Sequence, residues 1–285
     1  MSSRNVATCL FCALLILVSA SAHAGLLERI FAPQPDRWAY WEEADSKSTH
    51  MVDHSPWQVF LDAYVVKGDD GVNRVRYGSV TSADKKTLER YIESLRDVSV
   101  RRLSKAQQLA YWINLYNALT VNTVLKHYPV RSIRDIDISP GLFSDGPWGK
   151  KLLTIEGQDV SLNDIEHRIL RPIWRDPRVH YALNCASLGC PNLAMRAYDA
   201  LTVEQQMNEA ARVFVNSPRG VSIREGRLRV SSIYEWFRDD FGRNDSEVIE
   251  HLRKYASPAL ANRLTGVNGI YDDSYDWALN DASRH

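Results

Sequence analysis

Two cysteines close together, Cys185 and Cys190, are the feature that most constrains what this chain can form. They lie in the segment Arg178-Val-His-Tyr-Ala-Leu-Asn-Cys-Ala-Ser-Leu-Gly-Cys-Pro191, shortly after Glu166-His167. A thiol can act as a nucleophile, pair as a disulfide or bind a metal, and each outcome requires a particular local geometry. We therefore expect the chemistry of this protein in this segment.

The N-terminus is typical of a secretory signal peptide over residues 1–24. Arg4 supplies a positive start, residues 6–18 are mostly apolar, and Ala22-His23-Ala24 places small residues before a cleavage point. The other two cysteines, Cys9 and Cys12, lie inside the apolar run and would be removed with it. We expect an exported protein, periplasmic or secreted. No later run approaches the roughly 20 apolar residues that a membrane span needs.

Composition predicts an ordinary globular protein after cleavage. Hydrophobic residues make up 45% of the chain and charged residues 25%, which is enough to build a sizeable core. Lysine plus arginine equals aspartate plus glutamate, 35 each, so no global field recruits nucleic acid. We expect an N-terminal arm with the first helix and strand over residues 25–80 and a main globular domain over 81–285.

Hydrophobic spacing and turn residues predict an α+β fold, helix-rich, with a small antiparallel sheet. The longest helix begins at a capping box formed by Ser104 and Gln107 and ends before Pro129. A long connection over 129–151, rich in Pro and Gly, is expected to line a cleft. The other expected elements are an extended arm over 33–58, helices over 57–66, 83–98, 162–170, 202–216 (capped by Thr202), 232–241 and 245–255, strands over 72–80 and 179–184, hairpins of 152–155 with 159–161 and of 221–224 with 228–230, and an aromatic tail over 271–277.

Three polar residues on the predicted helices stand out. Asn114 and Asn117 lie in the middle of the longest helix, where asparagine competes for backbone groups; either they have buried partners or they lie on a solvated face. Glu166 falls near the apolar side of its helix, whereas His167 points away from it. A carboxylate there needs a cation or hydrogen-bond donors. An ordinary ion pair with Arg168, Arg171 or Arg175 would satisfy it equally well.

Cys185 is the candidate nucleophile, because it follows a predicted strand where backbone amides can lower a thiol pKa. The amides of Ala186 and Ser187 are candidate oxyanion donors. His167 and His180 compete as the base, and a fully extended chain would place His180 about 16 Å from Cys185. Asn114, Asn117 or Glu166 would orient that base, as in Cys-His-Asn hydrolases.

Other uses of the same residues remain open. In an oxidising compartment Cys185 and Cys190 can form a structural or redox disulfide. Both cysteines with one histidine would make a zinc set, but the spacing lacks a paired C-x-x-C, so no metal is assigned. The histidines can equally be structural, and no phosphate or dinucleotide glycine signature implies an organic cofactor.

Four stretches together resemble the family called domain of unknown function 547, over about residues 100–240. They are Tyr111-Trp-Ile-Asn-Leu-Tyr-Asn-Ala118, Leu162-Asn-Asp-Ile-Glu-His167, His180-Tyr-Ala-Leu-Asn-Cys-Ala-Ser-Leu-Gly-Cys-Pro191 and Ser232-Ile-Tyr-Glu-Trp-Phe. The closing Tyr275-Asp-Trp-Ala-Leu-Asn280 resembles tails of bacterial members.

The resemblance implies that the hallmark positions of this family are Asn114, Asn117, Glu166, His167, His180 and Cys185. It also implies that Cys190 matches a position that plant-type members fill differently, which argues against an obligatory disulfide. The order of histidine before cysteine suggests a distant, permuted similarity to papain-like or transglutaminase-like thiol folds, which by itself does not settle function.

The sequence therefore predicts an exported thiol-dependent hydrolase or acyl or amide transferase that uses a Cys-His pair on a small-molecule or peptide substrate. The alternative is a non-catalytic envelope binding module in which the polar residues form a buried network and the cysteines a disulfide.

Overall fold

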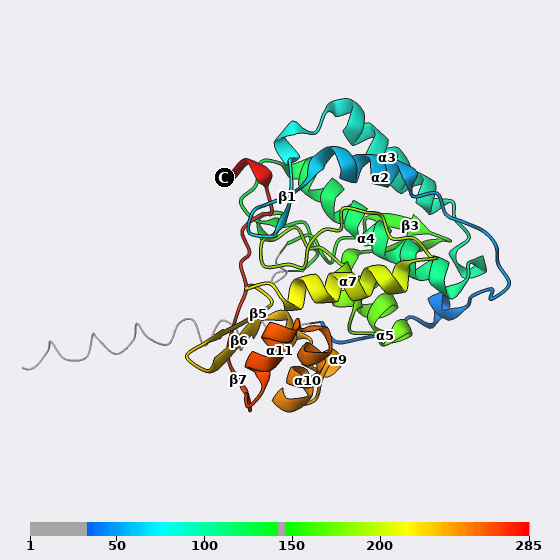
Figure 1. The fold of residues 1–285 in the computed structure, drawn as a ribbon. Helices are drawn as coiled ribbons and strands as arrows, with labels where there is room; N and C mark the ends of the chain where they lie inside the picture. The colour runs from blue at the N-terminus through cyan, green and yellow to red at the C-terminus, as the bar shows by residue number, and fades with distance from the viewer. Residues whose placement is uncertain (1–32, 142–145, 285) are drawn as a thin grey trace, which may run out of the picture.

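The computed structural model describes residues 33–141 and 146–284. The predicted signal peptide over 1–24 lies outside these residues. Helices dominate, and three small sheets lie around them (Figure 1). The α-helices are α2 (Ser55–Tyr64), α3 (Ser82–Arg96), α4 (Lys105–His127), α5 (Arg171–Trp174), α6 (Val179–Ala182), α7 (Val203–Val215), α8 (Ile233–Trp236), α9 (Arg238–Phe241), α10 (Asp245–Tyr255) and α11 (Pro258–Leu264).

Shorter helical turns and the strands complete the described chain. The turns are η1 (Ala39–Glu42), η2 (Tyr77–Ser79), η3 (Val100–Arg102), η4 (Ile133–Asp135), the π-helix η5 (Asp164–Leu170) and η6 (Ala282–Arg284). The strands are β1 (Val65–Lys67), β2 (Asn73–Val75), β3 (Leu153–Ile155), β4 (Gln158–Val160), β5 (Val221–Arg224), β6 (Arg227–Ser231) and β7 (Ile270–Ser274). The α+β class with small antiparallel sheets is confirmed. None of the described helices is long and apolar enough to cross a membrane.

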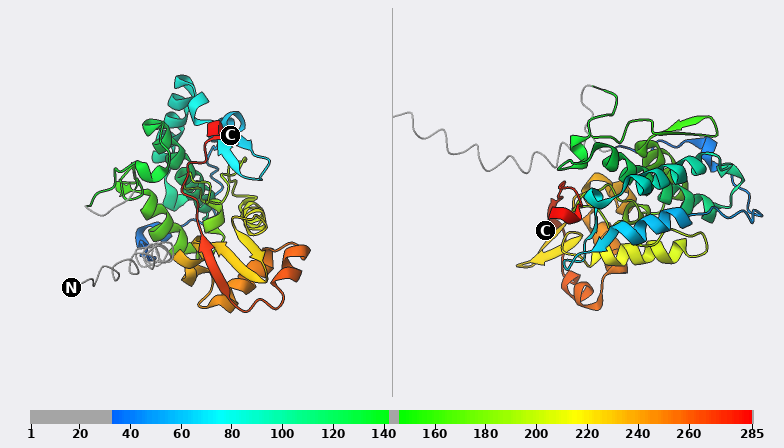
Figure 2. Two further views of the ribbon diagram at one scale, coloured as in Figure 1. Left: turned by 90° about the vertical axis from the view of Figure 1, so that its left-hand side faces the viewer. Right: turned by 90° about the horizontal axis from the view of Figure 1, so that it is seen from above.

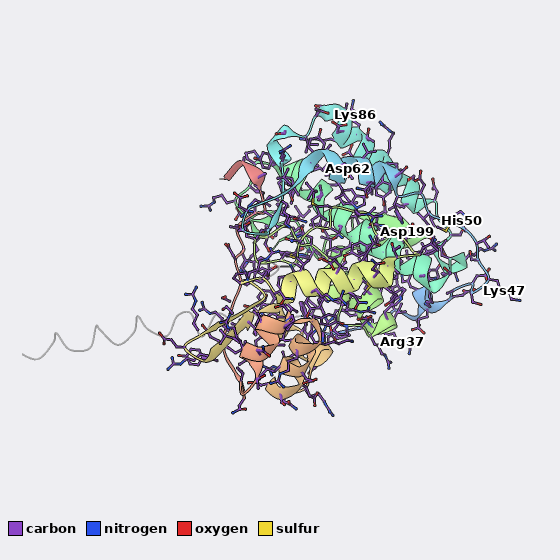
Figure 3. All side chains as sticks on the ribbon, in the orientation of Figure 1. Arg37, Lys47, His50, Asp62, Lys86 and Asp199 are labelled. Carbon is purple, nitrogen blue, oxygen red and sulfur yellow. The ribbon has the colours of Figure 1, made fainter. Side chains whose placement is uncertain are left out.

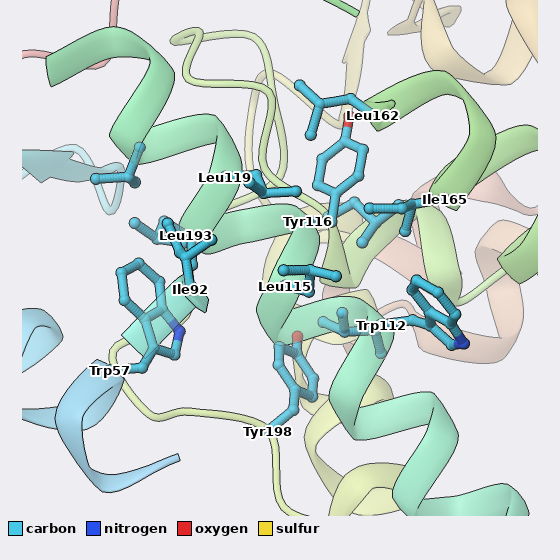
Figure 4. Close-up of a cluster of buried hydrophobic side chains, with 14 of the residues drawn as sticks. Trp57, Ile92, Trp112, Leu115, Tyr116, Leu119, Leu162, Ile165, Leu193 and Tyr198 are labelled. Atoms are coloured by element: carbon cyan, nitrogen blue, oxygen red, sulfur yellow. The ribbon is translucent and has the colours of Figure 1, made fainter. Parts of the chain in front are cut away.

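Helix α4 is the axis of the larger hydrophobic core. Its residues from Gln107 to Leu125 are all buried, as expected for a helix that is apolar on every side. Tyr116 of α4 packs beside Leu162 and Ile165, and Trp112 lies one turn earlier (Figure 4). Ser104 caps this helix by accepting a hydrogen bond from the amide of Gln107. This is one of the two hydrogen bonds of the predicted capping box. A helix enclosed on all sides makes every polar residue on it structurally consequential.

The N-terminal arm packs against the core, as its tryptophans indicate. Trp41 and Trp57 are buried, and Trp41 meets Trp112 of α4 edge to face at 5.0 Å. The arm runs past the C-terminal part of η5 and α5 (Figure 1), where the amides of Asp36 and Trp38 donate to the carbonyls of η5. A second core cluster lies between α7, α10, α11 and the sheet of β5, β6 and β7.

Several predicted elements are wrong in type. Residues 179–182 form helix α6 rather than a strand, because Asp176 accepts a hydrogen bond from the amide of Arg178 and Pro177 presets a helical turn. The predicted strand over 72–80 is β2 followed by the turn η2. The helix predicted over 232–241 breaks at Phe237 into α8 and α9.

Local caps and the tail also differ in part. Thr202 makes no side-chain cap on α7. The helix start predicted at Ser161 and Asp164 is confirmed, because the amide of each residue donates a hydrogen bond to the side chain of the other. The tail predicted from aromatic residues contains strand β7, which pairs in parallel with β6. The burial of its residues does not alternate along the strand, and most of them are exposed. The segment is therefore a strand because it pairs with β6, not because of its own hydrophobic pattern.

The C-terminal segment crosses the molecule and lies along the cysteine loop (Figure 2). Leu188 and Gly189 donate to carbonyls of Ala278 and Asp276, and the amide of Asn280 donates back to Ala186. This crossing is made by backbone hydrogen bonds. Charged side chains such as Lys86 and Asp62 lie on the outside of the molecule (Figure 3).

Gly189 permits this close approach, so we predict that Gly189→Ala is destabilising. An added Cβ would lie 2.6 Å from the amide nitrogen of Asp276, which is backbone and cannot move aside alone. Overpacking of this kind costs about 1–3 kcal/mol in unfolding free energy. Urea unfolding measures the loss. Gly269→Ala is the matched control, because its Cβ meets only a carboxylate oxygen of Asp245 at 3.3 Å. Equal stability of the two variants would contradict the close contact.

Candidate functional site

The cysteine segment is held against α4 by an asparagine amide. Asn117 donates from Nδ2 to the carbonyl of Ala182 at 3.0 Å and accepts at Oδ1 from the amide of Asn184 at 2.8 Å. Asn184 in turn donates to the carbonyl of Pro191 and accepts from the amide of Ala186. Asn117 thus positions the chain immediately before Cys185, as a buried partner rather than a solvated residue.

The sulfur of Cys185 lies in a compact polar cluster. It is 2.9 Å from the sulfur of Cys190, 2.9 Å from the hydroxyl of Tyr275 and 3.3 Å from that of Ser187. Ser187 and Tyr275 are joined at 2.9 Å, and the amide of Cys185 donates to the Cys190 sulfur. Cys185 is half-buried, whereas Cys190 is buried, and both are free thiols.

These contacts make the two thiols unequal. Burial raises the pKa of Cys185, but hydrogen bonds with Cys190, Ser187 and Tyr275 outweigh burial and lower it below the usual value. Burial, together with the nearby charge of Cys185, raises the pKa of Cys190 well above its usual value. Burial also raises the pKa of Tyr275, so its hydroxyl stays protonated and able to donate. Cys185 is therefore the thiol that ionises first.

Tyr275 was not among the site residues predicted from sequence. It follows β7 and reaches Cys185 only because the C-terminal segment folds back along the cysteine loop. The tail Tyr275 to Asn280 was singled out by its resemblance to bacterial members of the family, and that was the one available signal. Its ring packs on Trp236 at 4.7 Å and on Trp277 at 4.6 Å, which keeps the hydroxyl in place.

The backbone after Cys185 is unusual. Ala186 has a φ of 61°, in the left-handed region that a residue with a side chain rarely adopts. Its amide is occupied by Asn184, so it is not free to stabilise an oxyanion as predicted. The amide of Ser187 has no acceptor within the described parts of the chain. One of the two expected oxyanion donors therefore remains.

The predicted residues His167, His180 and Glu166 form a second cluster with Arg171 and Asp240. Asp240 was not predicted from the sequence, which indicated Arg171 only as a possible ion-pair partner of Glu166. His180 lies 2.7 Å from Asp240 through Nε2 and 3.6 Å from Glu166 through Nδ1. Arg171 donates from Nε to Asp240 Oδ2 at 2.5 Å, and its Nη1 lies 3.0 Å from His167 Nδ1. Glu166 and His167 are 4.0 Å apart.

The π-helix explains why this cluster forms. Its wider turn displaces side chains from the angles of a regular helix, so both Glu166 and His167 face the interior. The prediction that His167 points away from the apolar side is therefore wrong: this residue is 6% exposed. Glu166 accepts a hydrogen bond from the hydroxyl of Tyr116 at 3.0 Å instead of pairing directly with an arginine.

Burial and charge shift the pKa values in this second cluster. Burial raises the pKa of Glu166, but its contacts with His167, His180 and Arg171 outweigh burial and bring it to about 2. The pKa of Asp240 is lowered to about 2 by its contacts with His180 and Arg171, against burial. Burial, aided by Arg171, lowers the pKa of His167 to about 4. The cluster therefore holds ionised carboxylates and a neutral His167 near pH 7.

The structure does not join the two clusters through a histidine. Within the described residues, the hydrogen-bond partners of the Cys185 side chain are Cys190, Ser187 and Tyr275. The link is electrostatic: the negative charge of Glu166 opposes ionisation of Cys185. Asn114 belongs to neither cluster, because its amide bonds to the backbone of Tyr198 in both directions.

Asp240 is the most exposed member of the second cluster, with 20% of its side chain exposed against 2% for Arg171. Two clefts of about 370 and 220 Å³ share Arg171 in their lining and are bordered by the N-terminal arm and by α8 and α9. Neither of these two clefts includes the described part of the 129–151 connection, so the cleft expected there stays a prediction. Across residues 33–141 and 146–284, no three His, Cys, Asp or Glu side chains are arranged to hold a metal ion.

Fold and site together define an α+β protein with one half-buried and one buried free thiol, and with a separate cluster of mostly buried charged groups. Residues 100–215 match the family model described as "Protein of unknown function, DUF547". This match supports membership of the family, as the resemblance predicted. All the site residues predicted from sequence lie inside the matched segment, whereas Asp240 and Tyr275 lie outside it. No curated protein and no solved structure matched the chain.

We predict that Cys185 is alkylated at a lower pH than an ordinary cysteine. Tyr275→Phe and Ser187→Ala each remove a hydroxyl that stabilises the thiolate, so each should raise the pH at which alkylation is half maximal. Rates of iodoacetamide reaction across pH, followed on the peptide that contains Cys185, measure this. Tyr271→Phe is the control, since that tyrosine is 65% exposed and contacts Arg227. Unchanged profiles in both hydroxyl variants would contradict the assignment.

Acid should destabilise the fold through the second cluster. Unfolding returns His167 to its usual pKa of 6.5 and Glu166 to 4.5, so the unfolded chain binds more protons as the pH falls. Stability should therefore decline from pH 6.5 downward. Glu166 should contribute on the order of 3 kcal/mol, lost as the pH falls from about 4.5 to about 2.

Urea unfolding at a series of pH values measures this decline. Glu166→Gln should flatten its lower part, because glutamine does not titrate. Glu250→Gln, at a side chain that is 76% exposed, is the matched control and should leave the profile unchanged. A wild-type profile that is level from pH 6.5 to 2 would contradict the burial of these groups.

Proposed function

We propose that Cys185 and Cys190 form a redox-active dithiol that exchanges with the disulfide of a small molecule or peptide. The observation that carries this proposal is the 2.9 Å contact between two free sulfurs of unequal character. Cys185 is half-buried with a lowered pKa, and Cys190 is buried with a raised one. An attacking thiolate and a protected resolving thiol have these properties.

The reaction balances with an external disulfide as the oxidant. The Cys185 thiolate attacks one sulfur of the substrate, forming a mixed disulfide and releasing the other half as a thiolate. The released thiolate takes up a proton. Cys190 then loses its proton, attacks the Cys185 sulfur and releases the second half of the substrate as a thiolate, which takes up the proton that Cys190 lost. The protein gains one internal disulfide, and the substrate is reduced to two thiols.

The neighbours of the sulfurs support the order of these steps. Tyr275 and Ser187 stabilise the thiolate on Cys185 before attack. The charge of that thiolate is one cause of the raised pKa of Cys190. Once the mixed disulfide forms, that charge is gone, so Cys190 becomes easier to ionise at the stage when it must attack.

Acyl transfer by Cys185 is the second candidate, and it includes the predicted hydrolase. The left-handed conformation of Ala186 and the free amide of Ser187 favour it, because strained backbone beside a nucleophile can aim an oxyanion donor. A histidine base would have to act without direct contact to Cys185, since the hydrogen bonds of His167 and His180 go to other groups. The dithiol therefore accounts for more of the geometry.

Trapping of the mixed disulfide tests the proposal. Wild-type protein treated with bis(2-hydroxyethyl) disulfide should end with an internal Cys185–Cys190 bond and no adduct. In Cys190→Ser the resolving thiol is missing, so the adduct should remain on Cys185, and Cys185→Ser should show neither product. Peptide mass spectrometry distinguishes the three products and separates these residues from Cys9 and Cys12.

Each alternative gives a different result in the same variants. An adduct that persists on wild-type Cys185 would contradict resolution by Cys190. A Cys185–Cys190 disulfide that forms but resists reduction by dithiothreitol in the folded protein would indicate the structural role of the binding-module alternative. Thioester hydrolysis that survives Cys190→Ser and is lost in Cys185→Ser would indicate acyl transfer.

A further inference from the structure

The larger cleft lies between the N-terminal arm, α5 and α9, away from the thiols. It has a volume of about 370 Å³, within the range of small-molecule sites. Its charged lining is Arg37, Arg171, Arg175, Asp176, Asp239 and Asp240. We infer that this cleft binds a small zwitterion whose positive and negative groups are separated, such as a short peptide or an ω-amino acid. This inference does not depend on the dithiol.

The α5 side of the cleft carries an arginine without an ion-pair partner among the described residues. Arg175 ends α5 in a left-handed conformation, with a φ of 52°, which turns the chain at the cleft edge. Its guanidinium is exposed and has no ion pair within the described residues. The charge of Arg175 acts on the carboxylate of Glu42, which already pairs with Arg37, and the neighbouring Asp176 pairs with Arg178. Figure 3 shows Arg37 at the edge of the molecule beside α5. Two arginines thus share one glutamate.

The other side carries free carboxylate oxygens from α9. Asp239 is exposed and forms no ion pair with any described residue. Asp240 uses Oδ2 for both Arg171 and His180, which leaves Oδ1 without a donor in the described structure. An ammonium group of a ligand would complete this carboxylate pair at the opening of the cleft.

A buried arginine joins the two helices that line the cleft. Arg171 donates to Asp240 from Nε and to the carbonyl of Pro33 from NH1, and it lies under the ring of Phe237 at 4.7 Å. Its side chain is 2% exposed. This buried arginine ties α5, which Arg175 ends, to α9, which carries Asp239. A ligand with one charge would leave either Arg175 or Asp239 unpaired.

A matched set of three probes tests this inference on the full chain. Isothermal titration calorimetry should detect binding of 6-aminohexanoate and much weaker binding of hexanoate and hexylamine, which carry one charge each. Arg175→Gln and Asp239→Asn should each weaken binding of the zwitterion about two- to fivefold, the effect of one exposed ion pair. Circular dichroism checks that these surface variants fold.

Two controls separate this site from other parts of the protein. Asp272→Asn removes an exposed ion pair with Arg229 on the β6–β7 sheet and should leave binding unchanged. Cys185→Ser should also bind normally, so failure of the dithiol proposal would not affect this result. Equal binding of all three probes, no binding of 6-aminohexanoate, or a loss in only one of the two cleft variants would overturn the inference.

Discussion

The two hydrogen bonds of the Asn117 amide tie the cysteine segment to the central helix. Both bonds go to backbone groups, the carbonyl of Ala182 and the amide of Asn184, so they define where the chain leaves α6. Buried backbone groups that lost such a partner would cost about 1–3 kcal/mol each. The position of Cys185 therefore depends on a residue one helix away, inside the most enclosed part of the core.

The site is built from segments that are remote in sequence, and each has a physical reason to be there. The π-helix turns Glu166 and His167 inward, and the N-terminal arm bonds to its carbonyls. The C-terminal tail pairs with the cysteine loop and delivers Tyr275. Glu166 links the two clusters through its charge. It contacts the histidines and accepts a hydrogen bond from Tyr116, and its negative charge opposes ionisation of Cys185.

The division into two clusters changes the chemistry expected of these residues. A Cys-His pair would place an imidazole on the sulfur, whereas the described sulfur contacts a second thiol and two hydroxyls. Hydroxyls that remain protonated can stabilise a thiolate without taking its proton. The histidines instead belong to a charged network whose most exposed member is Asp240. The residues that line the larger cleft include neither of the two thiols.

The sequence by itself determined the local features. Apolar spacing predicts α4, the Ser161–Asp164 start and the two hairpins, because each depends on neighbours within a few residues. It also identified Cys185, His180 and Glu166 as unusual. Only the tertiary structure decided which residues meet. Helix α6 in place of a strand, the π-helix, strand β7 and the contacts of Tyr275 and Asp240 all depend on partners distant in the chain. Local patterns carry no information on such partners, because contact energies between remote segments exist only once the core has brought them together.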